Sequence, residues 1–223
     1  MKTLHIVLFL TGCGGNIIRF LLSLDASTYP IHPLNESYDK PYDRVKLYSY
    51  KNLFWKHGSW IRFENYFLGH IQDPLTHFLK QDKFNIMTLH LHPGRMDESI
   101  AAYDKFKEVH SENLKNLNVT YSLVTISPKY QEYVDWFMDN AKNSKLLTPA
   151  NMIDKLAYDK LSTELNPYLI NFDNFIISEQ TFIDEYTKLC RYLNLPYNIN
   201  DALTVYRSWR QARRIDEWLS IKK

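Results

Sequence analysis

The sequence predicts an α/β fold, namely a three-layer αβα domain with a mostly parallel central sheet of the P-loop type. Three observations predict it. Short apolar runs alternate along the chain with longer amphipathic segments, which is the pattern of strands joined by helices. The first run, Leu4 to Leu10, is almost continuously apolar, as in a parallel strand that is buried on both faces. A glycine-rich turn and a helix pattern follow it directly, as in phosphate-binding loops.

The other elements follow in order. Apolar residues recur at helical spacing from Ile17 to Leu24, whereas residues 29–50 combine prolines and tyrosines without periodicity and predict a long surface loop. Short helices are expected at 60–67 and 74–79. Further strands are expected at 84–90, 119–126 and 168–172, and further helices at 97–114, 129–140, 149–164, 179–193 and 201–219. With 223 residues and 45% hydrophobic content, residues 1–223 are expected to form a single domain.

Composition argues against several classes of partner and location. Lys+Arg number 27 and Asp+Glu 25, so no overall basic field predicts nucleic-acid binding. No apolar stretch approaches the roughly 20 residues that cross a bilayer, so no membrane partner is expected. Two cysteines are too few for a disulfide framework and favour a cytoplasmic location. Residues 1–13 also match a lipoprotein leader ending at Cys13, but His5 in the apolar run and the amphipathic helix after it argue against this alternative.

The glycine-rich turn lies within the segment FLTGCGGNIIRFLL, residues 9–22. Glycines 12, 14 and 15 can adopt positive φ and let backbone N–H groups approach an anion, while the helix N-terminus adds partial positive charge. The turn therefore predicts a phosphate site, with the alternative that the glycines only form a tight turn. No Lys-[Ser/Thr] pair follows, which disfavours an ATPase of the Walker A type. The candidate binding residues are Thr11, Gly12, Cys13, Gly14, Gly15, Asn16 and Arg19.

This loop and the IIRFLLSL that follows it resemble the 5′-phosphosulfate-binding loop of sulfotransferases, especially the Lys-Gly-Gly-Thr form of the glycan-modifying branch. Residues 168–196 are similar to the family's segment in which a strand ends at an acidic residue and a helix leads to a Leu-Gly-Leu-Pro-like close. The resemblance implies 3′-phosphoadenosine 5′-phosphosulfate as the cofactor, held by residues 12–16 and Ile17. It also implies sulfuryl transfer to a hydroxyl-bearing acceptor such as a glycan.

Two histidines are the candidate catalytic bases. His90 and His92 lie in TLHLHP at the predicted end of a strand, which resembles the Thr-His-Leu-Pro stretch that carries the catalytic histidine of cytosolic sulfotransferases. An imidazole titrates near neutrality and can accept the proton of the acceptor hydroxyl. In the alternative, both are ordinary surface residues at a strand end. A His-x-His metal pair is not expected, because no Asp, Glu or Cys nearby completes a ligand set.

The sequence also departs from the family's pattern. Cys13 stands where the family has the loop lysine, and the arginine and serine of the 3′-phosphate site fall at Ile126 and Val134. Ser127 and Arg210 are the candidate nucleotide-binding residues nearest to these roles. Arg210 belongs to a set of arginines expected to share one side of the last helix, where they either hold a phosphate or form a solvated basic face: Arg207, Arg210, Arg213 and Arg214.

Three functions stay open on these grounds. The first is a divergent sulfotransferase, which makes the assignment as an enzyme uncertain because of the missing lysine. The second is a catalytically inactive member of the same fold that binds a nucleotide or a partner. The third is a kinase-like phosphotransferase.

Overall fold

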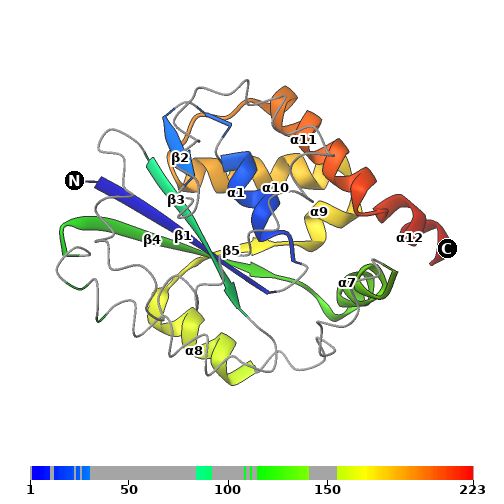
Figure 1. Ribbon diagram of the computed structural model, residues 1–223, viewed down its shortest axis with the longest axis horizontal. Helices are drawn as coiled ribbons and strands as arrows, with labels where there is room; N and C mark the ends of the chain where they lie inside the picture. Colours follow the sequence, from blue (N-terminus) through cyan, green and yellow to red (C-terminus); the bar gives the residue numbers. More distant parts are fainter. Residues whose placement is uncertain are drawn as a thin grey trace.

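The computed structural model describes residues 2–10, 13–22, 24, 25, 27–30, 84–91, 108, 111, 115–140 and 155–222 (Figure 1). In this part of the chain, five strands form one parallel sheet in the order β2-β3-β1-β4-β5. The strands are β1 (Lys2–Leu10), β2 (Thr28–Pro30), β3 (Phe84–Leu91), β4 (Leu117–Thr125) and β5 (Tyr168–Asn171).

Helices cover both faces of this sheet. Figure 1 shows α1, α9, α10 and α11 on one side and α8 on the other, so the predicted three-layer αβα fold is confirmed. The described helices are α1 (Gly15–Leu22), α7 (Pro128–Asn140), α8 (Lys155–Leu165), α9 (Asp173–Ile177), α10 (Glu179–Tyr192), α11 (Ile199–Ala212) and α12 (Ile215–Ile221). None of the helices in these ranges is long and apolar enough to cross a membrane.

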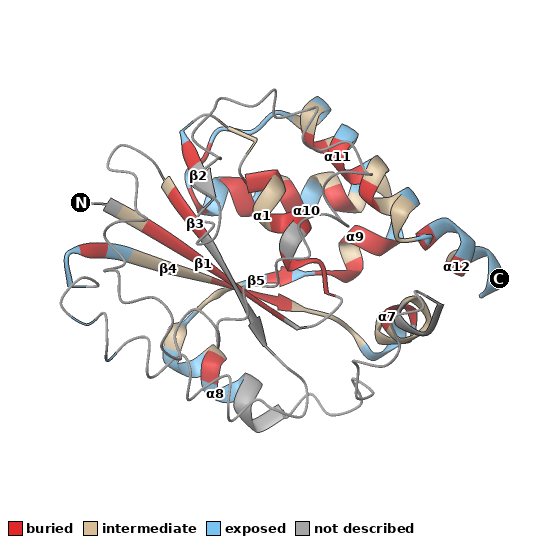
Figure 2. Ribbon diagram, viewed as in Figure 1, coloured by how far each residue is buried: buried red, intermediate tan, exposed pale blue. Residues whose placement is uncertain are grey.

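Strand β1 lies at the centre of the sheet because most of its side chains are apolar, on both faces. Leu4, Ile6, Val7 and Leu8 are fully buried, and Figure 2 shows the strand in the colour of buried residues. It pairs with β3 on one side and with β4 on the other. The apolar run from Leu4 therefore predicted both the strand and its central place.

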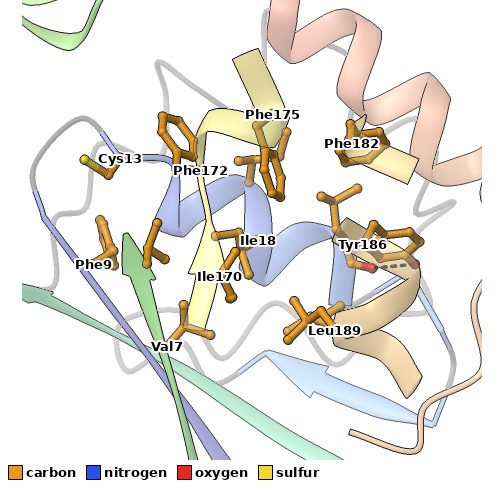
Figure 3. Packing of buried hydrophobic residues seen from close by; sticks show 14 of the residues in the cluster. Val7, Phe9, Cys13, Ile18, Ile170, Phe172, Phe175, Phe182, Tyr186 and Leu189 are labelled. Carbon is orange, nitrogen blue, oxygen red and sulfur yellow. Dashed lines mark hydrogen bonds between the residues drawn. The ribbon is translucent and has the colours of Figure 1, made fainter. Parts of the chain in front are cut away.

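An aromatic core joins α1 to the C-terminal helices. Phe172, Phe175 and Phe182 are fully buried, and Figure 3 shows them beside Ile18 of α1. The Phe182 ring stacks on that of Tyr206, with centroids 4.0 Å apart. Aromatic pairs of this kind contribute to stability beyond the area that they bury. This core fixes α9, α10 and α11 against the helix that follows the glycine-rich turn.

The other predicted strands and most of the predicted helices within the described ranges are confirmed, and two short elements were not expected. Residues 28–30, expected in a turn and the start of a surface loop, form β2, which pairs with β3. Residues 173–177, expected in a connection, form α9. The expected helices at 60–67 and 74–79, most of that at 97–114, and the rest of the 29–50 loop lie outside the described residues.

The single helix expected at 201–219 is wrong. The chain forms α11 and α12 instead, and Arg214 between them has a left-handed backbone with φ 51°. The break lets Ile215 and Trp218 become buried. The Trp218 ring packs edge-on against Tyr133 of α7 at 5.5 Å between centroids. The burial of these apolar side chains favours the turn over a continued helix.

Candidate anion-binding site

The glycine-rich turn connects the central strand to α1 at the carboxyl edge of the sheet. From β1 the chain runs towards β3 and β2, whereas from β4 it runs towards β5. The strand order therefore reverses between β1 and β4. In open parallel sheets, ligands bind outside the carboxyl ends of the strands at this kind of reversal. The turn before α1 and Ser127 after β4 both lie at this position.

Two glycines of the turn are required by the packing around them. Gly14 has φ +71°, and a Cβ there would lie 2.2 Å from Cε2 of Phe172. A Cβ on Gly15 would lie 2.1 Å from ring atoms of Phe9. Packing against Phe172 and Phe9 therefore explains the two glycines without any ligand. The tight turn also leaves the first N–H groups of α1 without partners inside the helix, which is the property that anion-binding turns use.

Cys13 is a neutral thiol inside the turn. Its side chain is fully buried, and burial raises the pKa of the thiol to about 12. Arg213 opposes this rise in pKa, while the carboxylates of Asp135 and Asp173 add to it. Cys13 therefore supplies no charge at neutral pH. The charged groups that act on it come from α7, α9 and the end of α11.

The other candidate residues of the turn and of α1 differ in burial and position. Ile17 is fully buried in the core. Asn16 is the second residue of α1. Arg19 is partly buried, and its guanidinium carbon lies 5.2 Å from the centre of the Phe20 ring. Thr11 and Gly12 lie outside the described residues.

Of the two candidate bases, the structure describes one position. His90 lies in β3 opposite Phe9 of β1, one residue before the carboxyl end of the strand. This places it at the same edge of the sheet as the glycine-rich turn. His92 lies outside the described residues.

Ser127 and Asp173 form the neighbouring part of the edge. The backbone N–H of Ser127 donates to Oδ1 of Asp173 at 3.0 Å, and its carbonyl accepts from the first turn of α7. The backbone N–H of Phe172 donates to the Thr125 carbonyl at 2.8 Å, so the ends of β4 and β5 are tied together. Asp173 was not predicted as a site residue. The signal in the sequence was an acidic residue directly after a strand.

Arg210 holds three elements together. Its guanidinium donates to Oδ1 of Asp216 in α12 at 2.7 and 2.9 Å, to the Ile176 carbonyl of α9 at 2.8 Å, and to the Tyr206 hydroxyl at 2.6 Å. These bonds use donors on three nitrogens of the fork. The arrangement gives Arg210 a structural role at the junction of α9, α11 and α12.

The four C-terminal arginines do not share one helix side, because the helix breaks after Ala212. Arg207 forms a two-point ion pair with Glu179, and Arg214 pairs with Glu217. The guanidinium carbon of Arg213 lies 4.3 Å from the centre of the Phe137 ring. The set of arginines is thus divided among different surroundings.

Chemically, the described residues of this edge combine backbone N–H donors, the neutral thiol of Cys13 and the carboxylate of Asp173. No group of three or more His, Cys, Asp or Glu within the described ranges is arranged to hold a metal ion. The chain matches no family model, no curated protein and no solved structure.

Proposed function

We propose that the protein is a divergent sulfotransferase-like protein of the P-loop type. It binds 3′-phosphoadenosine 5′-phosphosulfate against the turn before α1 and passes the sulfuryl group to a hydroxyl acceptor. The observation that supports this best is the position of the turn, which joins the central buried strand to a helix at the reversal of strand order.

The proposed reaction needs few chemical groups. The acceptor oxygen forms a bond to sulfur, the bond from sulfur to the phosphate oxygen breaks, and the hydroxyl proton passes to a base. As in phosphoryl transfer, positioning and stabilisation of charge on the leaving oxygen provide most of the catalysis. His90 or His92 is the proposed base. Backbone N–H groups at the start of α1 are the proposed contacts of the 5′ end.

Calorimetric titration with adenosine 3′,5′-bisphosphate, the product nucleotide, tests donor binding directly. We expect one site per chain with a Kd on the order of micromolar, near −8 kcal/mol. An excess of adenosine 5′-monophosphate serves as the control ligand, because it lacks the 3′-phosphate and should bind more weakly. Absence of binding at millimolar concentrations of the bisphosphate would overturn the proposal.

One observation favours a second candidate, a nucleotide-binding protein without catalysis. Cys13 stands where the resemblance predicts a lysine, and the thiol is buried and neutral. Without a replacement cation, charge on the leaving oxygen is poorly stabilised. In that case the bisphosphate binds, but no sulfuryl group is transferred from the donor to a hydroxyl, and His92→Ala changes nothing. A kinase-like enzyme would instead turn over ATP with magnesium.

A further inference from the structure

Strand β5 forms one edge of the described sheet, and the backbone groups of its alternate residues point away from β4. Their direction follows from the pairing of Thr125 with Asn171. The backbone N–H of Phe172 donates to the Thr125 carbonyl, so it faces β4. Successive residues of a strand present their N–H and C=O groups to opposite sides, and the groups of Asn171 and Leu169 therefore face outwards. Outward groups of an edge strand can pair with another chain.

The outward N–H of Asn171 is covered by a carboxylate from α10. It donates to Oε1 of Glu185 at 3.0 Å, and Oε2 of Glu185 accepts from Nδ2 of Asn174 in α9 at 2.8 Å. The carbonyl of Asn174 accepts in turn from the Thr181 hydroxyl at 2.8 Å, near the start of α10. The Glu185 side chain is thus held between the end of β5, α9 and its own helix.

Glu185 is a buried carboxylate without a cation. The residue is only 5% exposed, and it forms no ion pair within the described ranges. Moving a carboxylate out of water costs free energy, which neutral donors offset only in part. Its effect at the strand edge therefore explains the presence of Glu185 better than a gain in stability does.

The other outward position, Leu169, has no such cover. No described residue bonds to its outward N–H or C=O, and its side chain is 51% exposed. The exposed Tyr192 ring lies at the same edge, where it stacks on Tyr168 at 4.6 Å between centroids. The edge thus combines an open backbone position with apolar side chains, which is the surface that an identical strand can use for pairing.

A twofold axis beside β5 would pair the strands of two copies antiparallel. Leu169 of one copy can then lie opposite Asn171 of the other, and each such pair exchanges both of its backbone hydrogen bonds. Glu185 opposes this arrangement in two ways. It already occupies the N–H of Asn171, and it brings one negative charge from each copy to a small interface, where like charges repel.

We propose that the Glu185 carboxylate keeps β5 from pairing with β5 of a second copy of the chain. The proposal is independent of the proposed function, because no nucleotide takes part in it. It assigns the buried carboxylate a role in the solution state of the protein.

Sedimentation velocity over concentrations from roughly ten to a few hundred micromolar tests the proposal. The unaltered protein should sediment as a monomer. Glu185→Ala should lower the Kd of dimerisation at least about tenfold, to roughly tens of micromolar. Glu185→Gln removes the charge but keeps an acceptor for the N–H, so its Kd should lie between the two. The matched control is Asp184→Ala, which removes the neighbouring exposed carboxylate that accepts from Gln180, and it should stay monomeric.

A second substitution shows whether the association uses β5. Glu185→Ala combined with Leu169→Lys should return to the monomer, because lysine at an exposed edge position disfavours strand pairing. A dimer that persists in the double variant uses another surface and contradicts the proposal. Folded Glu185→Ala that stays monomeric contradicts it as well. So does an unaltered protein that dimerises and that Leu169→Lys alone separates.

Amide hydrogen exchange of the unaltered protein gives a measurement that needs no variant. The covered N–H of Asn171 should exchange at least about tenfold more slowly than the open N–H of Leu169. Equal exchange at the two positions would overturn the proposal, because the carboxylate would then not cover the edge. If circular dichroism shows that Glu185→Ala does not fold, this comparison decides.

Discussion

His5 is a polar residue at the centre of the sheet with both ring nitrogens engaged. Nδ1 lies 2.9 Å from the Thr120 hydroxyl, and Nε2 lies 2.9 Å from the Ser122 hydroxyl. The neutral ring can donate from one nitrogen and accept at the other, so both hydroxyls are satisfied. Burial lowers the pKa of the imidazole to about 3, and the backbone of Thr120 opposes this shift. His5 therefore has a structural role in joining β1 to β4.

The lowered pKa predicts a stability loss in acid. The unfolded chain binds a proton at His5 near the ordinary pKa of 6.5, whereas the folded chain does so only near 3. The contribution of neutral His5 is complete above pH 6.5 and declines as pH falls towards 3. Between pH 7.5 and 5.5 this group should cost about 1.4 kcal/mol of unfolding free energy.

Urea unfolding of the unaltered protein and of His5→Gln at these two pH values measures that cost. Glutamine can still bond to the hydroxyls but does not titrate. The pH-dependent loss in the variant should be smaller by about 1.4 kcal/mol, while its stability at pH 7.5 should be lower than that of the unaltered protein. Equal pH dependence in the two proteins would show that His5 does not remain neutral in the folded state.

At the scale of elements, the turn before α1 depends on the contact between Gly14 and Phe172. Gly14→Ala adds a methyl group that would lie 2.2 Å from the ring, at a backbone φ of +71°. The collision should cost about 1–3 kcal/mol of unfolding free energy, and the left-handed backbone roughly 1–2 kcal/mol more. Urea unfolding of the variant measures the sum.

A double-mutant cycle separates the two costs. Phe172→Leu shortens the side chain that faces the turn, so the added methyl group of Gly14→Ala should cost less in this background. The difference between backgrounds should be about 1–2 kcal/mol, leaving the backbone cost. An equal cost of Gly14→Ala in both backgrounds would contradict the collision and leave the backbone conformation as the sole reason for glycine.

The elements that could be predicted from the sequence are those whose own residues determine them. The run from Leu4 to Leu10 is apolar enough to specify a central strand without knowledge of its partners. Strand β2 could not be predicted, since three residues carry no periodicity and its pairing with β3 defines it. The break of the helix at Arg214 could not be predicted either. No glycine or proline marks it, and the burial of Trp218 against α7 is a tertiary effect.

The same distinction between local sequence and tertiary contacts applies to the candidate site. The glycine-rich turn could be located because a strand, glycines and a helix follow one another locally. The opposite effects of Arg213 and Asp135 on the pKa of Cys13 could not be predicted, because these residues lie about 200 and 122 positions away along the chain. The packing of Phe172 on Gly14 was also unpredictable from the sequence, although it gives the glycine a reason that involves no ligand.

At the scale of the whole molecule, the two cysteines test whether the chain unfolds as one unit. Cys13 lies before α1 and Cys190 lies in α10, and both are buried with thiol pKa values raised to about 12. The aromatic core between α1 and α10 connects their surroundings (Figure 3). Since thiolates are the species that react with alkylating agents, both should be protected in the folded state.

Iodoacetamide labelling in a series of urea concentrations, read by peptide mass spectrometry, follows each cysteine separately. If residues 1–223 form a single cooperative domain, both cysteines should become labelled at the same urea midpoint, and that midpoint should match the loss of circular dichroism. Labelling of the fully unfolded chain gives the reference rate for each thiol. Selective labelling of Cys13 without urea would show that the turn opens locally while the core stays folded, since local opening exposes a group without global unfolding. In that case adenosine 3′,5′-bisphosphate, if it binds at the turn, should slow the labelling of Cys13 and leave Cys190 unchanged.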